Sequence, residues 1–214
     1  MYVKSRMSAN PYTIAADAPI NEVIELMREK NLKRVPVVKG DLVVGMLTNS
    51  DIQKVSPTKA TTLSIYELNY LLAKTKVSDA MSKEVISISP DGLLEEAAVL
   101  MRDNRVGTLA VVEEGKIVGI ITESDIFDAF IDLLGFRNTG SRIAVDAADV
   151  PGALASIGEI FNSQNANITH IVAYRGSGGR SDVVIRTNAI NTEEIESKLK
   201  ENSFNIIDVA HYQK

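Results

Sequence analysis

Residues 45–52 read Gly45-Met46-Leu47-Thr48-Asn49-Ser50-Asp51-Ile52, and 74 positions later the chain reads Gly119-Ile120-Ile121-Thr122-Glu123-Ser124-Asp125-Ile126. In both copies an apolar segment typical of a strand ends at threonine, and a Ser-Asp pair then opens a helix. The glycine three residues before the threonine leaves room for close approach of backbone or of a ligand. A motif that recurs at a fixed period indicates an internal duplication.

The duplication extends well beyond this motif. In the same register Leu26-Met27-Arg28 aligns with Leu100-Met101-Arg102, and no gap is needed from Met7 to Val55. A unit of about 50–60 residues is too small to bury a sizeable core by itself. We therefore expect the two copies, residues 1–56 and 77–134, to pack against each other.

Each copy is predicted to fold in the order strand, helix, strand, strand, helix. In the first copy apolar residues recur at helical spacing over 20–30, and two short apolar strands follow at 34–38 and 42–47. The helix after the motif is predicted to begin at Asp51 and to be capped by Asn49 or Ser50.

An insert at residues 57–76 separates the copies. Proline and threonine residues predict a loop at its start, and the spacing of apolar residues predicts a helix over 63–74. Two tyrosines on this helix, Tyr66 and Tyr70, fit either core positions or a partner surface.

The pattern changes after residue 134. Residues 135–141 have the composition of a linker. The remainder, 142–214, follows the order strand, helix, strand, strand, helix, strand, which is the ferredoxin-like order. The predicted elements are strands at 142–147, 167–174, 182–187 and 204–212, with helices ending near 165 and spanning 193–202. We expect an α+β protein of two packed repeats and a separate C-terminal domain.

Composition excludes several classes of function. The 214 residues include no cysteine, so the chain has no disulfides, thiolate metal site or cysteine nucleophile. A net charge of −5 argues against an extended nucleic-acid surface. No apolar run approaches a membrane span, and the first residues lack a secretory signal, so a cytoplasmic protein is expected. The two histidines, His170 and His211, lie on predicted strands without a catalytic or metal-ligating constellation, so no enzyme and no metal site are predicted.

The repeated segments resemble a tandem pair of cystathionine β-synthase (CBS) domains, often called a Bateman module. This resemblance rests on the glycine, threonine, serine and aspartate of both motifs and on the gap-free repeat around them. Residues 142–214 resemble an ACT domain, because Asp149-Val150-Pro151-Gly152-Ala153-Leu154 opens the first helix and Asn167-Ile168 opens the second strand. The domain order and the insert 63–69 resemble the acetoin-utilisation B protein family. The implied architecture is a pseudo-twofold CBS pair followed by a ferredoxin-like ACT domain.

The motif has chemistry that suits a nucleotide. The carboxylate of Asp51 can accept both hydrogens of a ribose diol. The hydroxyls of Thr48 and Ser50, with the free N–H groups of the helix, suit a phosphate. The same residues at a strand-to-helix junction also make a good helix cap with an acidic first turn, and this alternative stays open.

The resemblance implies two clefts that bind a regulatory ligand, either an adenine nucleotide such as AMP or ATP, or S-adenosylmethionine. The implied contact residues are Ile14, Arg34, Val35, Pro36, Gly45, Thr48, Ser50, Asp51, Gly119, Thr122, Ser124 and Asp125. Thr108 stands where the first copy has Arg34, so the second copy lacks a basic phosphate partner at that position. The first cleft is therefore expected to take the more highly charged ligand.

For the ACT domain the resemblance implies binding of a small effector such as an amino acid, or oligomerisation. The implied effector residues are Asp149, Gly152, Ala153, Leu154 and Asn167. Asp149 could instead cap the helix that follows it.

The predicted function is that of a non-enzymatic regulatory protein, with a homodimer implied by the resemblance. The alternative is an oligomeric adaptor that holds a metabolic enzyme without any ligand in its clefts.

Overall fold

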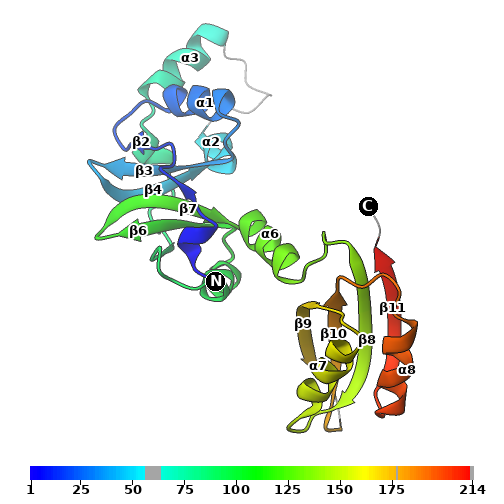
Figure 1. Ribbon diagram of the computed structural model, residues 1–214. Coiled ribbons are helices and arrows are strands. Elements are labelled where there is room, and N and C mark those ends of the chain that lie inside the picture. The colour runs from blue at the N-terminus through cyan, green and yellow to red at the C-terminus, as the bar shows by residue number, and fades with distance from the viewer. Residues whose placement is uncertain (56–63, 177, 213–214) are drawn as a thin grey trace. The chain divides into compact units, whose positions relative to one another are not determined.

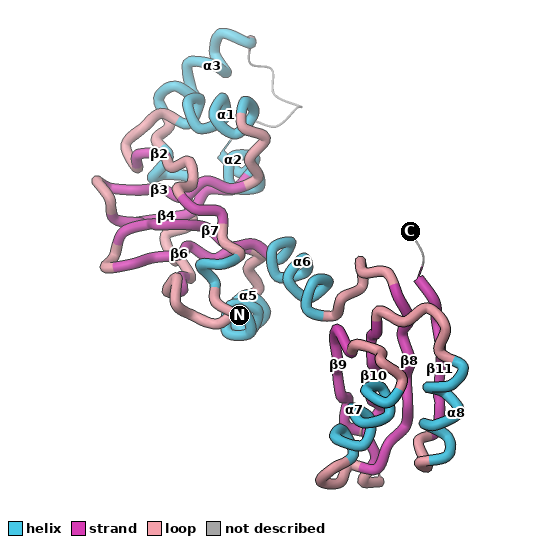
Figure 2. Tube along the Cα trace, in the orientation of Figure 1, coloured by secondary structure: helices cyan, strands magenta, loops and turns pink. Residues whose placement is uncertain are grey.

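The computed structural model describes residues 1–55, 64–176 and 178–212, and the predicted loop at the start of the insert lies outside them. The chain forms two compact units, Met1–Phe127 and Asp128–Lys214, and each is described by itself. Figures 1 and 2 show an open mixed sheet with helices beside it in the first unit, and a second, separate sheet with helices on it in the second unit. The predicted α+β architecture is confirmed.

The N-terminal unit follows the predicted order in both copies, with a short crossing segment added before each. Its elements are a short 3-10 helix η1 (Val3–Ser5), β1 (Ser8–Ala9), β2 (Ile14–Ala15), α1 (Ile20–Glu29), β3 (Arg34–Lys39), β4 (Leu42–Thr48), α2 (Asn49–Val55), α3 (Ile65–Lys74), α4 (Val77–Ala80), β5 (Ser87–Ile88), α5 (Leu94–Asn104), β6 (Thr108–Glu113), β7 (Lys116–Thr122) and α6 (Glu123–Leu133), whose last turns belong to the second unit.

The strands pair in the order β2-β3-β4-β7-β6-β5, so the two copies meet where β4 lies beside β7. Within each copy the parallel pair and the antiparallel pair have the same register: Ile14 opposes Val37 in the first copy, and Ile88 opposes Val111 in the second. Apolar side chains such as Ile20, Val35 and Leu47 are fully buried and form the core of the first copy. The expected duplicated and mutually packed pair is therefore present.

The N-terminal segment of each copy crosses to the other copy. Ser8 pairs with Ile120 on β7, and the equivalent Ser82 pairs with Met46 on β4 through two backbone hydrogen bonds of 2.9 Å. Further towards the N-terminus, the Val3 N–H donates to the Gly92 carbonyl, and the equivalent Val77 N–H donates to the Ala18 carbonyl, both at 2.9 Å. These crossing segments extend the repeat to the first residues of the chain, beyond the stretch that sequence identity revealed.

The motif glycines make room for the crossing segments. A Cβ added at Gly45 would overlap the sulfur of Met81 and lie 3.0 Å from the Ser82 carbonyl oxygen. At Gly119 the equivalent atoms are the sulfur of Met7 and the Ser8 carbonyl oxygen, at 2.6 and 3.1 Å. The close approach predicted at these glycines is therefore made by the backbone and methionine of the opposite copy.

Replacing Gly45 by alanine is expected to lower the free energy of unfolding by about 1–3 kcal/mol, because the added methyl overpacks the crossing segment. Urea unfolding followed by far-UV circular dichroism measures this change. Gly119→Ala should show a similar loss, since its surroundings are equivalent. Wild-type stability in both variants would contradict the tight crossing.

Two details differ from the sequence-based expectation. Helix α2 begins at Asn49 rather than at Asp51. The tyrosines of α3 are surface residues, with Tyr66 87% and Tyr70 58% exposed, so the core interpretation was wrong.

The C-terminal unit is the predicted ferredoxin-like sandwich. Its elements are β8 (Gly140–Ala148), α7 (Ala153–Ser163), β9 (Ile168–Arg175), β10 (Arg180–Thr187), α8 (Glu193–Glu201) and β11 (Asn205–Tyr212), with the strands in the order β11-β8-β10-β9. Both helices cover one face of this sheet (Figure 1), where Phe161 and Leu199 pack on Ile143 and Ile185. The opposite face carries the alternate residues of each strand.

The linker predicted at residues 135–141 is shorter in the structure, because β8 already begins at Gly140. Among the described residues, no helix combines the length and the apolar character needed to cross a bilayer.

Candidate functional site

Two clefts lie between the repeats, and each is lined by both of them. The first has a volume of about 230 Å³ and is lined by Arg34, Met46 and Thr48 together with residues 82, 84–86 and 105–108 of the second copy. The second has a volume of about 370 Å³ and is lined by residues 31–34 together with residues 107–108, 120 and 122–124. Most of their walls correspond through the 74-residue register: Thr122 replaces Thr48, Ile120 replaces Met46, and Asn31 replaces Arg105. The clefts are therefore two versions of one site.

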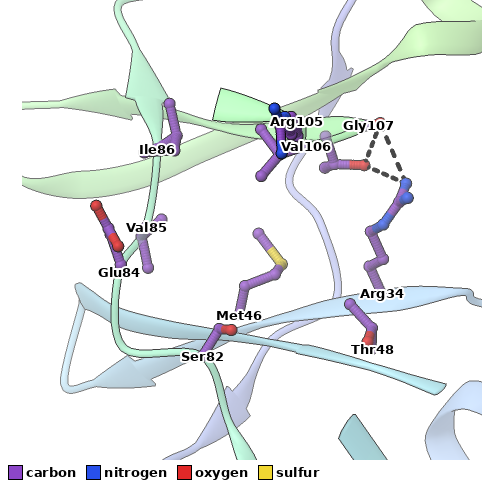
Figure 3. A pocket seen from close by; sticks show the side chains of 11 residues that line it. Arg34, Met46, Thr48, Ser82, Glu84, Val85, Ile86, Arg105, Val106 and Gly107 are labelled. Carbon is purple, nitrogen blue, oxygen red and sulfur yellow. Dashed lines mark hydrogen bonds between the residues drawn. The ribbon is translucent and has the colours of Figure 1, made fainter. Parts of the chain in front are cut away.

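Arg34 lines both clefts. Its guanidinium crosses to the second copy and donates to the Gly107 carbonyl at 3.1 Å and to the Thr108 hydroxyl at 2.6 Å. Figure 3 shows this side chain extending from β3 to Gly107 along one wall of the first cleft, with Met46 pointing between the two repeats. Because Thr108 is the counterpart of Arg34 in the repeat, this contact joins equivalent positions and lies between the two clefts.

The charges of the two clefts are more alike than the sequence comparison indicated. The first has Arg34 and Arg105 with Glu84, whereas the second has Lys33 and Arg34 with Glu123. Thr108 does replace a basic residue in the second copy, but the arginine of the first copy reaches that cleft as well. Position 108 itself has no basic residue, as expected from the sequence, and the expectation that the first cleft takes the more highly charged ligand stays a prediction.

The Thr-x-Ser-Asp motif forms a reciprocal helix cap in both copies. The Asp51 N–H donates to the Thr48 hydroxyl at 3.3 Å, and the Thr48 hydroxyl and N–H donate to the Asp51 carboxylate at 2.6 and 3.1 Å. Thr122 and Asp125 repeat these three contacts at 3.4, 2.7 and 2.8 Å. The cap is thus the threonine, not the predicted Asn49 or Ser50, because the helix begins two residues earlier than expected.

The carboxylate of Asp51 has more partners than that of Asp125. Lys54 donates to Asp51 Oδ1 at 2.9 Å, and only 7% of Asp51 is exposed. In the second copy Asp128 stands at the position of Lys54, and among the described residues the Asp125 carboxylate has only Thr122 as a partner. Burial raises the pKa of Asp51, but the hydrogen bonds from the Thr48 hydroxyl, from Lys54 and from the Thr48 N–H outweigh it and leave this pKa below its ordinary value.

Asp51→Asn is expected to reduce the free energy of unfolding at pH 7 by about 1 kcal/mol, because the cap and the Lys54 pair both use the negative charge. The folded-state pKa of Asp51 lies below its unfolded value, so this stabilisation is present above the unfolded pKa near 3.9. It is lost as the pH falls through the folded pKa, and the difference between variant and wild type should shrink in acid.

Urea unfolding at neutral and acidic pH measures this effect. The matched control is Asp41→Asn, since the side chain of Asp41 is 75% exposed and its pairing with Lys116 at 3.3 Å is a surface contact of little value. A constant difference between Asp51→Asn and wild type across the pH range would contradict the role assigned to the charge.

The other predicted cleft residues fall into two groups. Ser124 lines the second cleft, whereas its counterpart Ser50 is exposed outside the lining of the first. Val35 is fully buried, Pro36 is buried, and Ile14 packs against the same core, so none of the three lines either cleft. Val35 and Pro36 are therefore closed to an adenine in this structure, whereas Ile14 is only partly buried, and its contact with a ligand stays a prediction.

Sequence reasoning missed the residues that each cleft takes from the opposite copy. These are Glu84 to Ile86 and Arg105 in the first cleft, and Lys33 in the second. In the 74-residue register Arg34 aligns with Thr108, and these two side chains are in contact in the structure. The alignment alone does not show which positions of the two copies face each other, so these residues were not predicted.

Four of the predicted effector residues of the ACT domain, Asp149, Gly152, Ala153 and Leu154, lie in the loop between β8 and α7 or in the first turn of α7, whereas Asn167 precedes β9 at the opposite end of the sheet. Gly152 is the N-cap of α7, Leu154 is 50% exposed, and the Asn167 N–H donates to the Asn188 side chain at 3.0 Å. The carboxylate of Asp149 lies 3.9 Å from Arg175 and makes no cap bond, so its capping interpretation was wrong. These residues, with Ala153, do not line the two clefts described above.

Comparison with known proteins agrees with this architecture. A model of the CBS domain matches residues 3–57 and 77–132, just over half of the chain, and a model of the ACT domain matches residues 141–204. A Vibrio cholerae protein assigned to acetoin utilization, AcuB, has a similar structure, with a TM-score of 0.52, 27% identity, and coverage of 64% of this chain and 95% of that one.

Two similar structures contain adenosyl ligands. CBSX2 in complex with AMP has a TM-score of 0.50 and 25% identity over 61% of this chain and 96% of its own. The CBS pair of MJ0100, in complex with 5′-methylthioadenosine and S-adenosyl-L-methionine, has a TM-score of 0.50 and 25% identity over 61% of this chain and 99% of its own. The chain belongs to the CBS-domain family, as a tandem CBS pair followed by an ACT domain.

Proposed function

We propose that this protein is a regulatory sensor whose CBS clefts bind an adenine nucleotide or another adenosyl ligand. The observation that carries the proposal is the pair of clefts that correspond through the repeat, each walled by both copies and each containing Arg34. A ligand there touches both repeats at once, so its binding free energy can favour one packing of the repeats over another. The AMP and S-adenosyl-L-methionine complexes of similar CBS proteins support this ligand class.

The linings suit the parts of such a ligand. In the first cleft the apolar side chains of Met46, Val85 and Ile86 provide a wall for a purine, and Arg34 and Arg105 provide donors for a phosphate. The carboxylates of Asp51 and Asp125 are outside the two linings and accept hydrogen bonds from the lining threonines Thr48 and Thr122. In this proposal each carboxylate loses some of its helix-cap hydrogen bonds and accepts hydrogen bonds from the ribose diol in their place.

The two carboxylates differ in their capacity for this exchange. Three donors already reach Asp51, including Lys54, whereas Thr122 supplies both donors to Asp125. A carboxylate has about four lone-pair sites. We infer that Asp125 accepts a ribose diol with less rearrangement. This favours binding of an adenosyl group in the second cleft, even when the ligand has no phosphate.

Calorimetric titration with AMP, ATP, S-adenosylmethionine and NAD tests the proposal. At least one is expected to bind in saturable fashion, and the double variant Asp51→Asn, Asp125→Asn is expected to weaken that binding while remaining folded. Asp41→Asn is the control, because it removes a carboxylate outside both clefts. Absence of binding to all four ligands by the wild type would overturn the sensor proposal.

An adaptor function is the rival, and the exposed Tyr66 and Tyr70 of α3 are the observation that favours it. The adaptor function predicts that a metabolic enzyme copurifies with the chain, independently of nucleotide and dependent on these tyrosines.

In the sensor proposal the ACT domain binds a small effector or joins two chains as a homodimer in the cytoplasm. Sedimentation with and without nucleotide measures that assembly.

A further inference from the structure

The open face of the ACT sheet contains a cavity that none of the predicted sites uses. It has a volume of about 160 Å³, and its walls include Phe136, Arg142, His170, Arg186 and Tyr212. Because Ile143 and Ile185 point to the helices, the neighbouring Arg142 and Arg186 point to the opposite face. The cavity is therefore on the side of the sheet away from α7 and α8, and away from the loop at Gly152.

Basic groups form a row across this face. Arg186 on β10 is directly opposite His170 on β9 and Arg142 on β8. The guanidinium of Arg142 is already paired, since it donates to the Asp208 carboxylate at 2.8 Å. His170 has the Thr169 hydroxyl at 3.2 Å from its Nδ1. Arg186, in the middle of the row, has no such polar partner among the described residues.

Arg186 is buried, and its charge has no anionic partner among residues 1–55, 64–176 and 178–212. Only 7% of this residue is exposed, and its guanidinium lies over two neighbouring aromatic rings, 5.3 Å from the centroid of Phe136 and 5.0 Å from that of Tyr212. Within the described part of the chain, no carboxylate or other hydrogen-bond acceptor reaches its five N–H donors. Buried charges in proteins are ordinarily paired, and the ring faces supply attraction but accept little hydrogen bonding.

We propose that this cavity binds a small monocarboxylate, with its carboxylate on Arg186 and its apolar part against the sheet. A planar carboxylate matches the guanidinium fork through two parallel hydrogen bonds. One unpaired arginine balances one negative charge, whereas a phosphate dianion would retain excess charge against the apolar side chains of Val172 and Val184. The volume is close to that of a cavity of about 150 Å³ that holds benzene, so the ligand has roughly six to nine non-hydrogen atoms.

This site is independent of the CBS clefts, and its test uses the full chain without nucleotide. Calorimetric titration with benzoate and with 3-methylbutanoate is expected to show saturable binding of at least one. Benzamide and 3-methylbutanamide, which keep the shape and lose the charge, are expected to bind at least tenfold more weakly. Inorganic phosphate is titrated in parallel, and tighter binding of phosphate than of either carboxylate would overturn the assignment to a monocarboxylate.

Two variants locate the binding. Arg186→Gln is expected to weaken carboxylate binding at least tenfold, whereas Arg175→Gln is expected to leave it unchanged, since that side chain is 91% exposed and outside the cavity. Val172→Phe fills the cavity without changing its charge and is also expected to abolish binding. Circular dichroism establishes that each variant is folded.

If Arg186→Gln is unfolded, Val172→Phe decides the question alone. Failure of both carboxylates to bind, equal binding of acid and amide, or wild-type binding by folded Val172→Phe would each overturn the proposal. Because no adenosyl ligand is present, none of these outcomes depends on the sensor function.

Discussion

Arg34→Met is expected to weaken the binding of AMP in both CBS clefts, by about 10–100-fold in each. Its guanidinium lines both clefts, and its contacts with Gly107 and Thr108 hold it between them. Hydrogen bonds from a guanidinium to a phosphate are among the stronger polar contacts in proteins, and methionine keeps much of the side-chain length while removing every donor. Adenosine, which has no phosphate, should lose much less affinity.

Calorimetry with AMP and adenosine measures this loss, and two matched variants separate the clefts. Arg105 lines only the first cleft, so Arg105→Met should weaken one class of site and leave the other at wild-type affinity. Lys33→Met should do the same for the second cleft. An Arg34→Met protein that binds AMP as the wild type does, or that loses only one class of site, would show that the arginine is not shared.

The sequence alone predicted the duplicated unit, but it did not predict all of the residues that line the clefts. Helix α1 and strands β3 and β4 follow the apolar spacing of their own residues, so local pattern predicted them. Arg105 and Glu84 are more than 30 residues from the Thr48 motif. Glu84 reaches the first cleft because it follows Ser82, which pairs with the opposite copy, and Arg105 reaches it from the end of α5 in the opposite copy. No local period encodes this approach of one copy to the other.

The helix caps show the same limit at shorter range. A Thr-x-Ser-Asp stretch allows its threonine, asparagine or serine to cap, and composition does not choose among them. In the structure the Asp51 carboxylate binds the hydroxyl and the N–H of Thr48, which fixes the helix start at Asn49. For Tyr66 the sequence left a core position and a partner surface both open, and only the structure, in which α3 leaves it 87% exposed, chooses between them.

Gly140→Ala is expected to destabilise the ACT domain by about 3 kcal/mol or more. Glycine composition placed this residue in a linker, whereas it is the first residue of β8, a strand with neighbours on both sides, and it pairs with Tyr212. Its φ of +128° lies in a region that side chains rarely adopt, and a Cβ there would overlap the Thr187 carbonyl oxygen. Both the backbone and its neighbour on β10 would have to move.

Gly158→Ala is the matched control and has the opposite expected sign. This glycine is inside α7, and a Cβ there would meet no atom within 4 Å. Alanine should therefore stabilise the same domain by up to about 1 kcal/mol through helix propensity. Differential scanning calorimetry of the full chain should show the ACT transition lowered by Gly140→Ala and raised by Gly158→Ala, with the CBS transition unmoved. Equal transition temperatures for the two variants would mean that the strain at Gly140 is relieved by a shift of β8, and that the junction before the sheet behaves as the flexible linker its composition indicates.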